Sequence, residues 1–308
     1  MDRPLIVCIT PVKNEAWILE VFLTSASLWA DHIIIADQNS DDGSREIAKK
    51  FEKVILVDNN SDTFNEPERQ LLLLQEARKI PGNKLIVALD ADEFLSSKAL
   101  DLNNWQKMFT AKPGTAFGFI WPLIKDDFTS YWVSSNQHRY FAYYDDGAFH
   151  EGQKIHSPRI PISKDTKLVD INEFVIMHYQ FTDWERMESK HRWYQCYERV
   201  NFPKKSPISI YRMYHHMYNE KVLELIPKDW FDGYLERNVN IKGIHIDKIY
   251  RWDKLVDEYK RDFGDKLFKN IDLVGNNNIL LSYLRKTQKY SNLKIIKIVD
   301  KILKFFVK

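Results

Sequence analysis

Short apolar runs alternate with amphipathic segments over the first ninety residues. The apolar runs are rich in Ile, Val and Leu and occupy residues 5–10, 32–37, 53–58 and 84–90. Continuous runs of this length are typical of strands that are buried on both faces. Helical patterns fill the segments between them, at residues 14–28, 44–51 and 66–79. This alternation predicts a parallel sheet with helices on both faces.

Polar and helix-breaking residues mark the expected helix ends. Asn14 and Ser44 have the short polar side chains that favour the N-cap position. Pro81-Gly82 should stop the third helix. Residues 182–185, Thr-Asp-Trp-Glu, have the form of a capping box and predict the start of a later helix.

The pattern changes after the first hundred residues. Aromatic-rich stretches split by Pro, Gly and Asp occupy residues 112–179 and predict antiparallel or mixed strands that continue the sheet. The remainder reads as mostly helical. We therefore predict a sheet domain over residues 1–200 and a mostly helical region over residues 201–308.

The last eighteen residues, 291–308, form an amphipathic pattern with an apolar stripe and a lysine-rich opposite side. We favour the usual arrangement, in which such a terminal helix docks on its own core with the lysines in water. The alternative is contact with an anionic membrane surface.

Composition and charge exclude several classes of protein. The 308 residues are 44% hydrophobic and 29% charged, which is ordinary for a folded chain. The formal charge of +2 provides no overall field for nucleic acid, so we predict no nucleic-acid partner. Cys8 and Cys196 are too few for a disulfide framework, which fits a reducing, cytosolic compartment. The sequence contains no run of about 18 apolar residues, so we expect no membrane span, and we expect no export signal at the start.

Polar clusters follow three of the predicted strands. They occupy residues 10–15, 37–44 and 90–93. Ligands of open α/β sheets bind outside the carboxyl ends of the strands, so these clusters should meet along one edge. Neither the dinucleotide-binding glycine pattern nor the P-loop pattern occurs there, which disfavours hydride transfer and ATP hydrolysis.

Asp90 and Asp92 are the strongest metal candidates. Two ionised carboxylates at the end of a buried strand repel each other unless a cation lies between them. Mg²⁺ and Mn²⁺ are commonly held by one or two carboxylates together with phosphate oxygens and water. The alternative is a pair of solvated loop aspartates, one of which caps the next helix. The position directly after the apolar run favours the metal.

Three segments in order, residues 12–15, 31–44 and 89–94, resemble the family 2 glycosyltransferases of the GT-A fold. The resemblance extends over roughly residues 4–195. It implies a Rossmann-like, mixed but mostly parallel α/β sheet flanked by helices, followed by a mainly helical C-terminal extension. It also implies inverting transfer of a sugar from a nucleotide diphosphate donor, most simply a UDP-sugar, with Mn²⁺ or Mg²⁺ as cofactor.

The resemblance also implies roles for individual residues. Asp37 would bind the base, Asp90 the ribose, and Asp92 and His178 the metal. Other expected nucleotide contacts are Thr10, Pro11, Glu15 and Arg69. Trp121, Trp132, Arg139, Tyr140 and Tyr143 are candidates to flank the sugar, although most should be core residues.

An inverting reaction requires a base that accepts the proton of the attacking hydroxyl. Glu151, in the segment Phe-His-Glu-Gly, resembles the catalytic segment of transferases that build lipopolysaccharide core. Asp145, Asp146 and His156 are the alternatives. The expected acceptor is a glycan or glycolipid of a surface polysaccharide at the cytoplasmic face of the inner membrane.

Two other functions stay open from the sequence. A sugar-phosphate nucleotidyltransferase would use the same sheet, but its glycine-rich basic loop is missing from residues 11–16. A noncatalytic glycan-binding relative would keep the fold without turnover.

Overall fold

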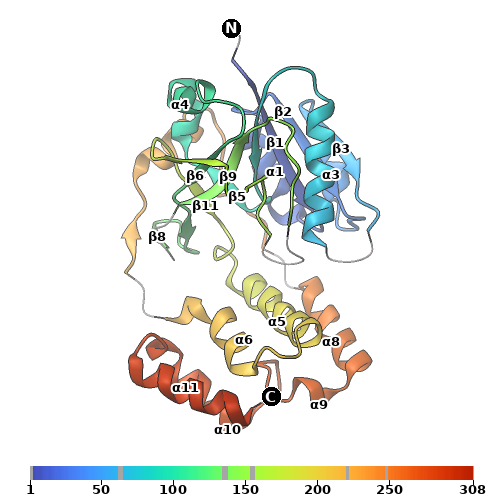
Figure 1. Ribbon diagram of the computed structural model, residues 1–308, viewed down its shortest axis with the longest axis vertical. Coiled ribbons are helices and arrows are strands. Elements are labelled where there is room, and N and C mark those ends of the chain that lie inside the picture. The colour runs from blue at the N-terminus through green and yellow to red at the C-terminus, as the bar shows by residue number, and fades with distance from the viewer. Residues whose placement is uncertain are drawn as a thin grey trace. The chain divides into compact units, whose positions relative to one another are not determined.

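The computed structural model describes residues 3–61, 65–133, 138–152, 157–219, 222–246 and 249–307. The chain divides into two compact units (Figure 1). The first consists of Met1–Thr182 and Glu224–Ile246, and the second of Asp183–Leu223 and Asp247–Lys308. The chain therefore enters the second unit, returns to the first for a short segment, and leaves it again. Residue 200, where the sequence pattern suggested a division, lies within a helix of the second unit.

A seven-stranded sheet forms the centre of the first unit, in the order β10-β6-β9-β4-β1-β2-β3. Its strands are β1 (Leu5–Val12), β2 (His32–Asp37), β3 (Val54–Asp58), β4 (Lys84–Ala88), β6 (Thr115–Phe119), β9 (Arg139–Tyr144) and β10 (Lys167–Ile171). Strand β1 pairs in parallel with β2 and β4, and β2 pairs in parallel with β3. Strand β9 runs antiparallel to β4 and β6. The predicted mixed, mostly parallel sheet is confirmed.

Burial explains why the apolar runs form these strands. Along β1, Ile6 and Cys8 lie in one hydrophobic cluster, while Val7 and Ile9 lie in another on the opposite face. Both faces are thus covered, as continuous apolar runs require. The expectation fails for β3, where Ile55 is 39% exposed. Among the described strands, this one is at the edge of the sheet and pairs with β2 alone.

Helices of the first unit cover both faces of the sheet. They are α1 (Ala16–Ala26), α2 (Ser44–Ala48), α3 (Glu66–Lys79), α4 (Gln106–Phe109) and α7 (Asp232–Leu235), with 3₁₀ turns η1 (Ser97–Leu100), η2 (Leu102–Trp105) and η4 (Lys228–Trp230). Residues of α1 pack with Ile6 and Cys8, and residues of α3 pack with Val7 and Ile9. The helix predicted over 66–79 is confirmed, and the other two are shorter than predicted.

The predicted N-caps are wrong, because tertiary contacts decide where these helices begin. Helix α1 is capped at Glu15, and the carboxylate of Asp42 accepts a hydrogen bond of 2.9 Å from the Ala16 amide. Asn14 instead has a left-handed backbone with φ of 56°. Ser44 is the first residue of α2, and Gly43 at φ 96° takes the cap position. The polar side chains of the loops after β1 and β2 thus bind the neighbouring loop and do not cap the helix that follows their own loop.

A second, five-stranded sheet has the order β12-β8-β7-β11-β5. Its strands are β5 (Glu93–Leu95), β7 (Pro122–Ile124), β8 (Ser130–Val133), β11 (Ile176–His178) and β12 (Glu224–Leu225). In the antiparallel pairing of β5 with β11, Glu93 lies opposite His178. The pairing brings the late histidine next to the polar segment that follows β4.

The second unit is helical. It contains α5 (Trp184–Asn201), α6 (Pro207–Tyr214), α8 (Arg251–Phe263), α9 (Asp265–Phe268), α10 (Ile279–Thr287) and α11 (Lys294–Phe306), with 3₁₀ turns η3 (His216–Tyr218) and η5 (Gln288–Tyr290). Helix α5 is capped by Asp183, whose carboxylate accepts from the Arg186 amide at 3.0 Å, and not by Thr182 as the capping-box pattern predicted. The Thr182 hydroxyl donates to the Tyr179 carbonyl instead. The predicted helical C-terminal extension is confirmed.

Helix α11 is held to its unit along one side only. Asp300 is buried and accepts hydrogen bonds from Arg212 and Tyr283, and Leu303 packs on the cluster around Tyr211. The predicted apolar stripe is largely exposed at Ile295, Ile298, Ile302, Phe305 and Phe306. The expected docking of this stripe on the protein core is therefore not observed. In the part of the chain that the structure describes, no helix meets the length and hydropathy needed to cross a membrane.

Candidate functional site

The carboxyl ends of β1, β2 and β4 lie together at one edge of the large sheet. These strands are parallel neighbours, so the segments that follow them must leave at the same edge. The polar clusters predicted from the sequence are those segments. Their positions relative to one another are set by the register of the central strands.

The loops that follow β1 and β2 are joined by hydrogen bonds. The Asn14 amide donates to the Ser40 hydroxyl at 2.9 Å, and the Asn14 side chain donates to Asp41 at 2.6 Å. The Glu15 amide donates to the hydroxyl of Ser44 at 2.9 Å. Several polar residues of these clusters thus hold the two loops together and do not face a ligand with these groups. The Glu15 carboxylate accepts from the indole of Trp17 at 2.7 Å, which fixes its direction.

Asp37, the last residue of β2, is 1% exposed and has one oxygen available. Its Oδ2 accepts from Arg45 at 2.9 Å and from the Ser40 amide at 3.2 Å. Its Oδ1 is buried and has no hydrogen-bond partner within the described ranges. Hydrogen bonds to Asp37 and, to a smaller extent, to Asp58 raise the pKa of Arg45. The Asp37 carboxylate is therefore fixed through Oδ2, while Oδ1 can accept a hydrogen bond from a ligand.

The other predicted nucleotide contacts differ in accessibility. Thr10 is fully buried, and its hydroxyl lies 3.6 Å from the Cys8 sulfur. Pro11, next along the strand, is half-buried. Arg69 is also half-buried and lies in the first turn of α3, which begins after the carboxyl end of β3. Pro11 and Arg69 are thus placed at the edge, whereas the Thr10 side chain belongs to the core.

An arginine that the sequence analysis did not identify joins the segment after β4. Arg159 forms an ion pair of 2.7 Å with Asp90 and a second ion pair with Glu93. Glu93 is fully buried and also accepts from the Asp90 amide at 2.9 Å and from the Trp121 indole at 2.9 Å. Asp90 keeps a 37% exposed side chain. This network holds Asp90 at the edge and leaves it accessible.

Burial and charge act in opposite directions on this network. Burial raises the pKa of Glu93, while the positive charge of Arg159 lowers it, and the net direction is upward. Burial lowers the pKa of Arg159, but the charges of Asp90 and Glu93 outweigh it and hold that pKa above its ordinary value. Arg159 is therefore the charge that permits a buried carboxylate at this position.

Asp92 and His178 come together at the same edge. Strand β4 ends at Ala88, so Asp90 and Asp92 lie beyond it and strand alternation does not set the directions of their side chains. Asp90 contacts Arg159, whereas Asp92 lies 3.4 Å from the Nε2 atom of His178. The side chains of Asp92 and His178 are largely buried, at 10% and 7% exposed respectively. The pairing of β5 with β11 produces this contact between residues far apart in sequence.

An aromatic stack borders His178. The ring of Trp121 lies 4.3 Å from the His178 ring, and the Arg139 guanidinium lies 4.1 Å from the Trp121 ring centre. Burial lowers the pKa of Arg139. Among the aromatic residues suggested to flank a sugar, Trp121 therefore lies beside the metal candidate His178.

The described residues contain no group of three His, Cys, Asp or Glu side chains that could hold a metal ion. Asp92 and His178 supply one carboxylate and one imidazole. A hard divalent cation bound by so few side chains completes its coordination with water and ligand oxygens. The pair fits a cation that binds together with a phosphate-bearing ligand.

Asp145 and Asp146 lie at the opposite edge of the sheet. The Asp145 amide donates to the carbonyl of Lys84, the first residue of β4, and its carboxylate pairs with Arg78 at 2.8 Å. Asp146 accepts from the Tyr143 hydroxyl at 2.5 Å. Both carboxylates are thus engaged near the amino end of β4, far along the strand from Asp90.

Glu151 lies near the same edge as Asp90. Arg78, in the last turn of α3, donates to the Ala148 carbonyl at 2.8 Å. Residues 148–152 therefore extend along α3 from its last turn towards its first turn. There Gly152 packs so closely on Pro67 that an added Cβ would lie 3.1 Å away. Glu151 is exposed, and its neighbour His150 is buried, which lowers the pKa of that imidazole. His156, the remaining alternative for the base, is outside the described residues.

The sequence carried little signal for Arg159. It follows an irregular segment and lies 66 residues from Glu93. Glu93 was assigned from the sequence to the polar cluster over residues 90–93, whereas the structure places it at the start of the buried strand β5. An acidic residue at such a position requires a cationic partner.

Comparison with protein families matches residues 7–163 to the model described as glycosyl transferase family 2. No curated protein sequence matches the chain. Solved structures with similarity include glucosyl-3-phosphoglycerate synthase from Mycobacterium tuberculosis in complex with Mn²⁺, uridine diphosphate and glucosyl-3-phosphoglycerate. That match has 18% identity and a TM-score of 0.28, and it covers 39% of this chain and 44% of that chain.

Two further solved structures are similar to parts of the chain. For 4-diphosphocytidyl-2C-methyl-D-erythritol synthase, identity is 13%, the TM-score 0.29, and coverage 58% of this chain and 74% of that chain. For a nucleoside-diphosphate-sugar pyrophosphorylase from Vibrio cholerae RC9, identity is 13%, the TM-score 0.27, and coverage 85% and 100%. The family match spans half of the chain and includes β1, β2 and β4 with the polar segments that follow them, and the chain belongs to glycosyl transferase family 2.

Proposed function

We propose that the protein transfers a sugar from a nucleotide diphosphate donor to a hydroxyl group of a glycan or glycolipid. Family membership supports the reaction class. The observation that carries the proposal is the approach of Asp92 to His178 at 3.4 Å, at the edge where Asp37 and Asp90 also end. Acidic side chains for a nucleoside and ligands for a cation thus occur side by side.

The donor is proposed to be a UDP-sugar. The unpartnered Oδ1 atom of Asp37 is suited to accept a hydrogen bond from the N–H group of a uracil ring. The accessible Asp90 carboxylate is suited to the ribose hydroxyls. Pro11, Glu15 and Arg69 would border the nucleotide, and the buried Thr10 would support the strand end beneath it.

The cofactor is proposed to be Mn²⁺ in preference to Mg²⁺. Mg²⁺ is bound almost entirely through oxygen, whereas Mn²⁺ also accepts an imidazole nitrogen such as that of His178. When bound, the cation would neutralise the charge that develops on the departing diphosphate. Asp92 and His178 would hold it.

Inversion requires one proton acceptor on the side of the incoming hydroxyl. In the proposed step, the acceptor oxygen forms a bond to the anomeric carbon while the bond from that carbon to the diphosphate breaks. Glu151 takes the hydroxyl proton, and UDP leaves. The exposure of Glu151 near the first turn of α3 suits contact with a large acceptor.

The proposal predicts that UDP-sugars bind and are slowly hydrolysed in the presence of Mn²⁺. Thermal unfolding should be measured with a panel of nucleotide sugars, because a ligand at 100 times its Kd stabilises by about 2.7 kcal/mol. UDP release should then be measured for the donor that raises the Tm. Release of inorganic diphosphate from a nucleoside triphosphate and a sugar phosphate would instead identify a nucleotidyltransferase. Binding without any release would identify a noncatalytic relative.

We further propose that α11 contacts the cytoplasmic face of an anionic membrane, where acceptors for surface polysaccharides such as lipopolysaccharide are built. The support is the exposed apolar stripe, in which Phe305 and Phe306 are 74% and 80% exposed. Lysines beside the stripe, at Lys294, Lys297, Lys301 and Lys304, would meet the lipid phosphates.

Replacing Phe305 and Phe306 with serine should weaken vesicle binding about tenfold or more, since each ring loses burial in the lipid. The measurement is co-sedimentation with vesicles that contain phosphatidylglycerol. Ile249→Ser, at another exposed apolar residue, is the matched control. Equal binding by the double variant and the control would contradict the proposal.

A further inference from the structure

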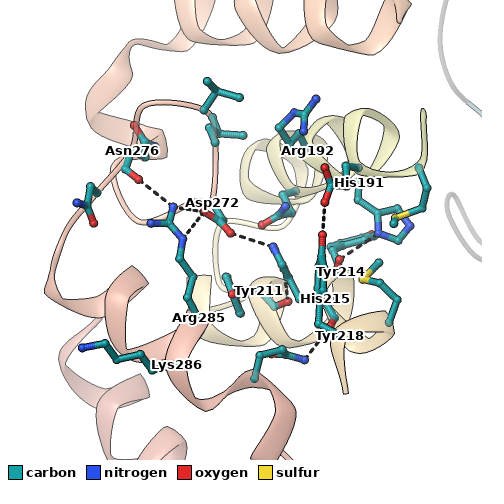
Figure 2. A pocket seen from close by; sticks show the side chains of 18 of the residues that line it. His191, Arg192, Tyr211, Tyr214, His215, Tyr218, Asp272, Asn276, Arg285 and Lys286 are labelled. Atoms are coloured by element: carbon teal, nitrogen blue, oxygen red, sulfur yellow. Dashed lines mark hydrogen bonds and ion pairs between the residues drawn. The ribbon is translucent and has the colours of Figure 1, made fainter. Parts of the chain in front are cut away.

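The second unit contains a cavity of about 780 Å³ that the proposed reaction does not use. It lies between α5, α6, α10 and the loop that contains residues 272–277 (Figure 2). All of its lining residues belong to the second unit. The volume is in the range of pockets that hold small organic ligands, such as one or two sugar rings.

Aromatic rings form one wall of the cavity. Tyr211 and His215 are stacked at 3.8 Å, and Tyr214 and Tyr218 line the same space. The Nδ1 atom of His191 lies 3.0 Å from the Tyr214 carbonyl, which holds the two helices together. Tyrosine rings with a polar tip suit the faces of pyranose rings, which are apolar above and below and polar at the edge.

The charges that line the cavity are mainly positive. The cations are Arg192, Arg285, Lys286 and Lys289, against the carboxylates Glu188 and Asp272. Figure 2 shows Asp272 between Arg285 and His215, and His215 Nε2 lies 2.9 Å from the carboxylate. Burial raises the pKa of Asp272, but hydrogen bonds from His215 and Arg285 bring it below its ordinary value.

Arg192 is paired with Asp253 at 2.8 Å and Arg285 with Asp272, whereas Lys286 is available to a ligand. Asp272 is ionised but fully engaged by its two neighbours, and Glu188 accepts hydrogen bonds from Trp184 and Tyr218. Lys286 has no ion-pair partner in the portion of the chain that the structure describes. A phosphate or carboxylate in the cavity could therefore pair with the Lys286 ammonium.

A buried amide points to a polar ligand independently of the charges. Gln195 lines the cavity and is 1% exposed. Its Oε1 atom is buried and has no hydrogen-bond partner among the residues described. Buried polar atoms in native proteins are almost always satisfied, here by water or by a hydroxyl of a ligand.

We propose that this cavity binds an acidic sugar, meaning a pyranose that carries a phosphate or carboxylate, as part of the acceptor glycan. The tyrosine rings of the wall, the amide of Gln195 and the ammonium group of Lys286 supply the three kinds of contact such a ligand needs. The assignment to the acceptor rests on the proposed function, whereas the binding itself does not.

The test is titration of the full-length protein with glucose 6-phosphate, glucuronic acid, glucose and inorganic phosphate. At least one acidic sugar should bind, and both neutral glucose and inorganic phosphate should bind at least about tenfold more weakly, because each lacks one kind of contact. Preference for the phosphate or the carboxylate arm identifies the acidic group. Glucose that binds as well as both acidic sugars, or phosphate that binds as well as both, would overturn the proposal, as would no binding by any of the four.

Variants locate the site. Lys286→Gln and Gln195→Leu should each weaken binding of the acidic sugar about tenfold. Lys266→Gln, at an exposed lysine of the same unit outside the cavity, is the matched control. Equal weakening by the control, or none by both cavity variants in folded protein, would overturn the proposal. Mn²⁺-dependent release of UDP from the donor needs no acceptor glycan. If the wild-type protein binds the acidic sugar but releases no UDP, only the proposed function is refuted.

Discussion

Asp92→Asn should lower the rate of Mn²⁺-dependent UDP release by about 10²–10³-fold, the usual cost of losing a group that stabilises charge in the transition state. The amide keeps the size of the side chain but lacks the charge that would hold the cation beside His178. The Tm should stay close to that of the wild type, because the hydrogen bond from Tyr179 goes to the Asp92 carbonyl and not to its side chain.

The matched control for this variant is Asp165→Asn, at an exposed aspartate outside the site. It should release UDP at the wild-type rate. A large fall in Tm for Asp92→Asn with UDP release intact would show that Asp92 has a structural role and no part in metal binding.

Arg159→Met should lower the free energy of unfolding by about 3–5 kcal/mol, because it removes one partner of a buried ion pair and leaves the other charged. Glu93 is fully buried and would keep only its bonds to Trp121 and the Asp90 amide. The measurement is urea unfolding at pH 7. The double variant Arg159→Met with Glu93→Gln should recover much of the loss, since no charge is then buried.

The same pair predicts a dependence on pH. Burial raises the pKa of Glu93, and loss of the Arg159 charge should raise it further. A carboxyl group with a raised folded pKa costs stability as pH rises from its unfolded pKa of about 4.3 towards the folded value. The stability difference between wild type and Arg159→Met should therefore be small near pH 4 and grow towards pH 7. A difference that does not change with pH, or no recovery in the double variant, would contradict this role of Arg159.

The parallel part of the fold follows from local pattern. The strand over residues 32–37 and the helix over 66–79 have the predicted bounds, because an uninterrupted apolar run and a capped amphipathic segment leave few alternatives. The site edge follows from the strands, since the carboxyl ends of parallel neighbours must meet. Asp37, Asp90 and Asp92 could therefore be placed together from the sequence, although their roles stay predictions.

Other features depend on contacts that no local pattern reveals. The start of α1 is fixed by Asp42 of another loop, so the favourable N-cap residue Asn14 is not used. Arg159 reaches Glu93 from an irregular segment, where periodicity gives no information. The cavity of the second unit is likewise assembled from three helices and a loop that share no motif. In each case the partner is distant in sequence and is chosen by the fold.

The most direct test of the central claim is the anomalous diffraction of a crystal grown with Mn²⁺ and UDP. We expect one manganese peak within bonding distance of the Asp92 carboxylate and the His178 imidazole, with diphosphate oxygens on the same ion and the uracil ring at Asp37. Density for UDP elsewhere, or a manganese ion bound without Asp92, would contradict the account.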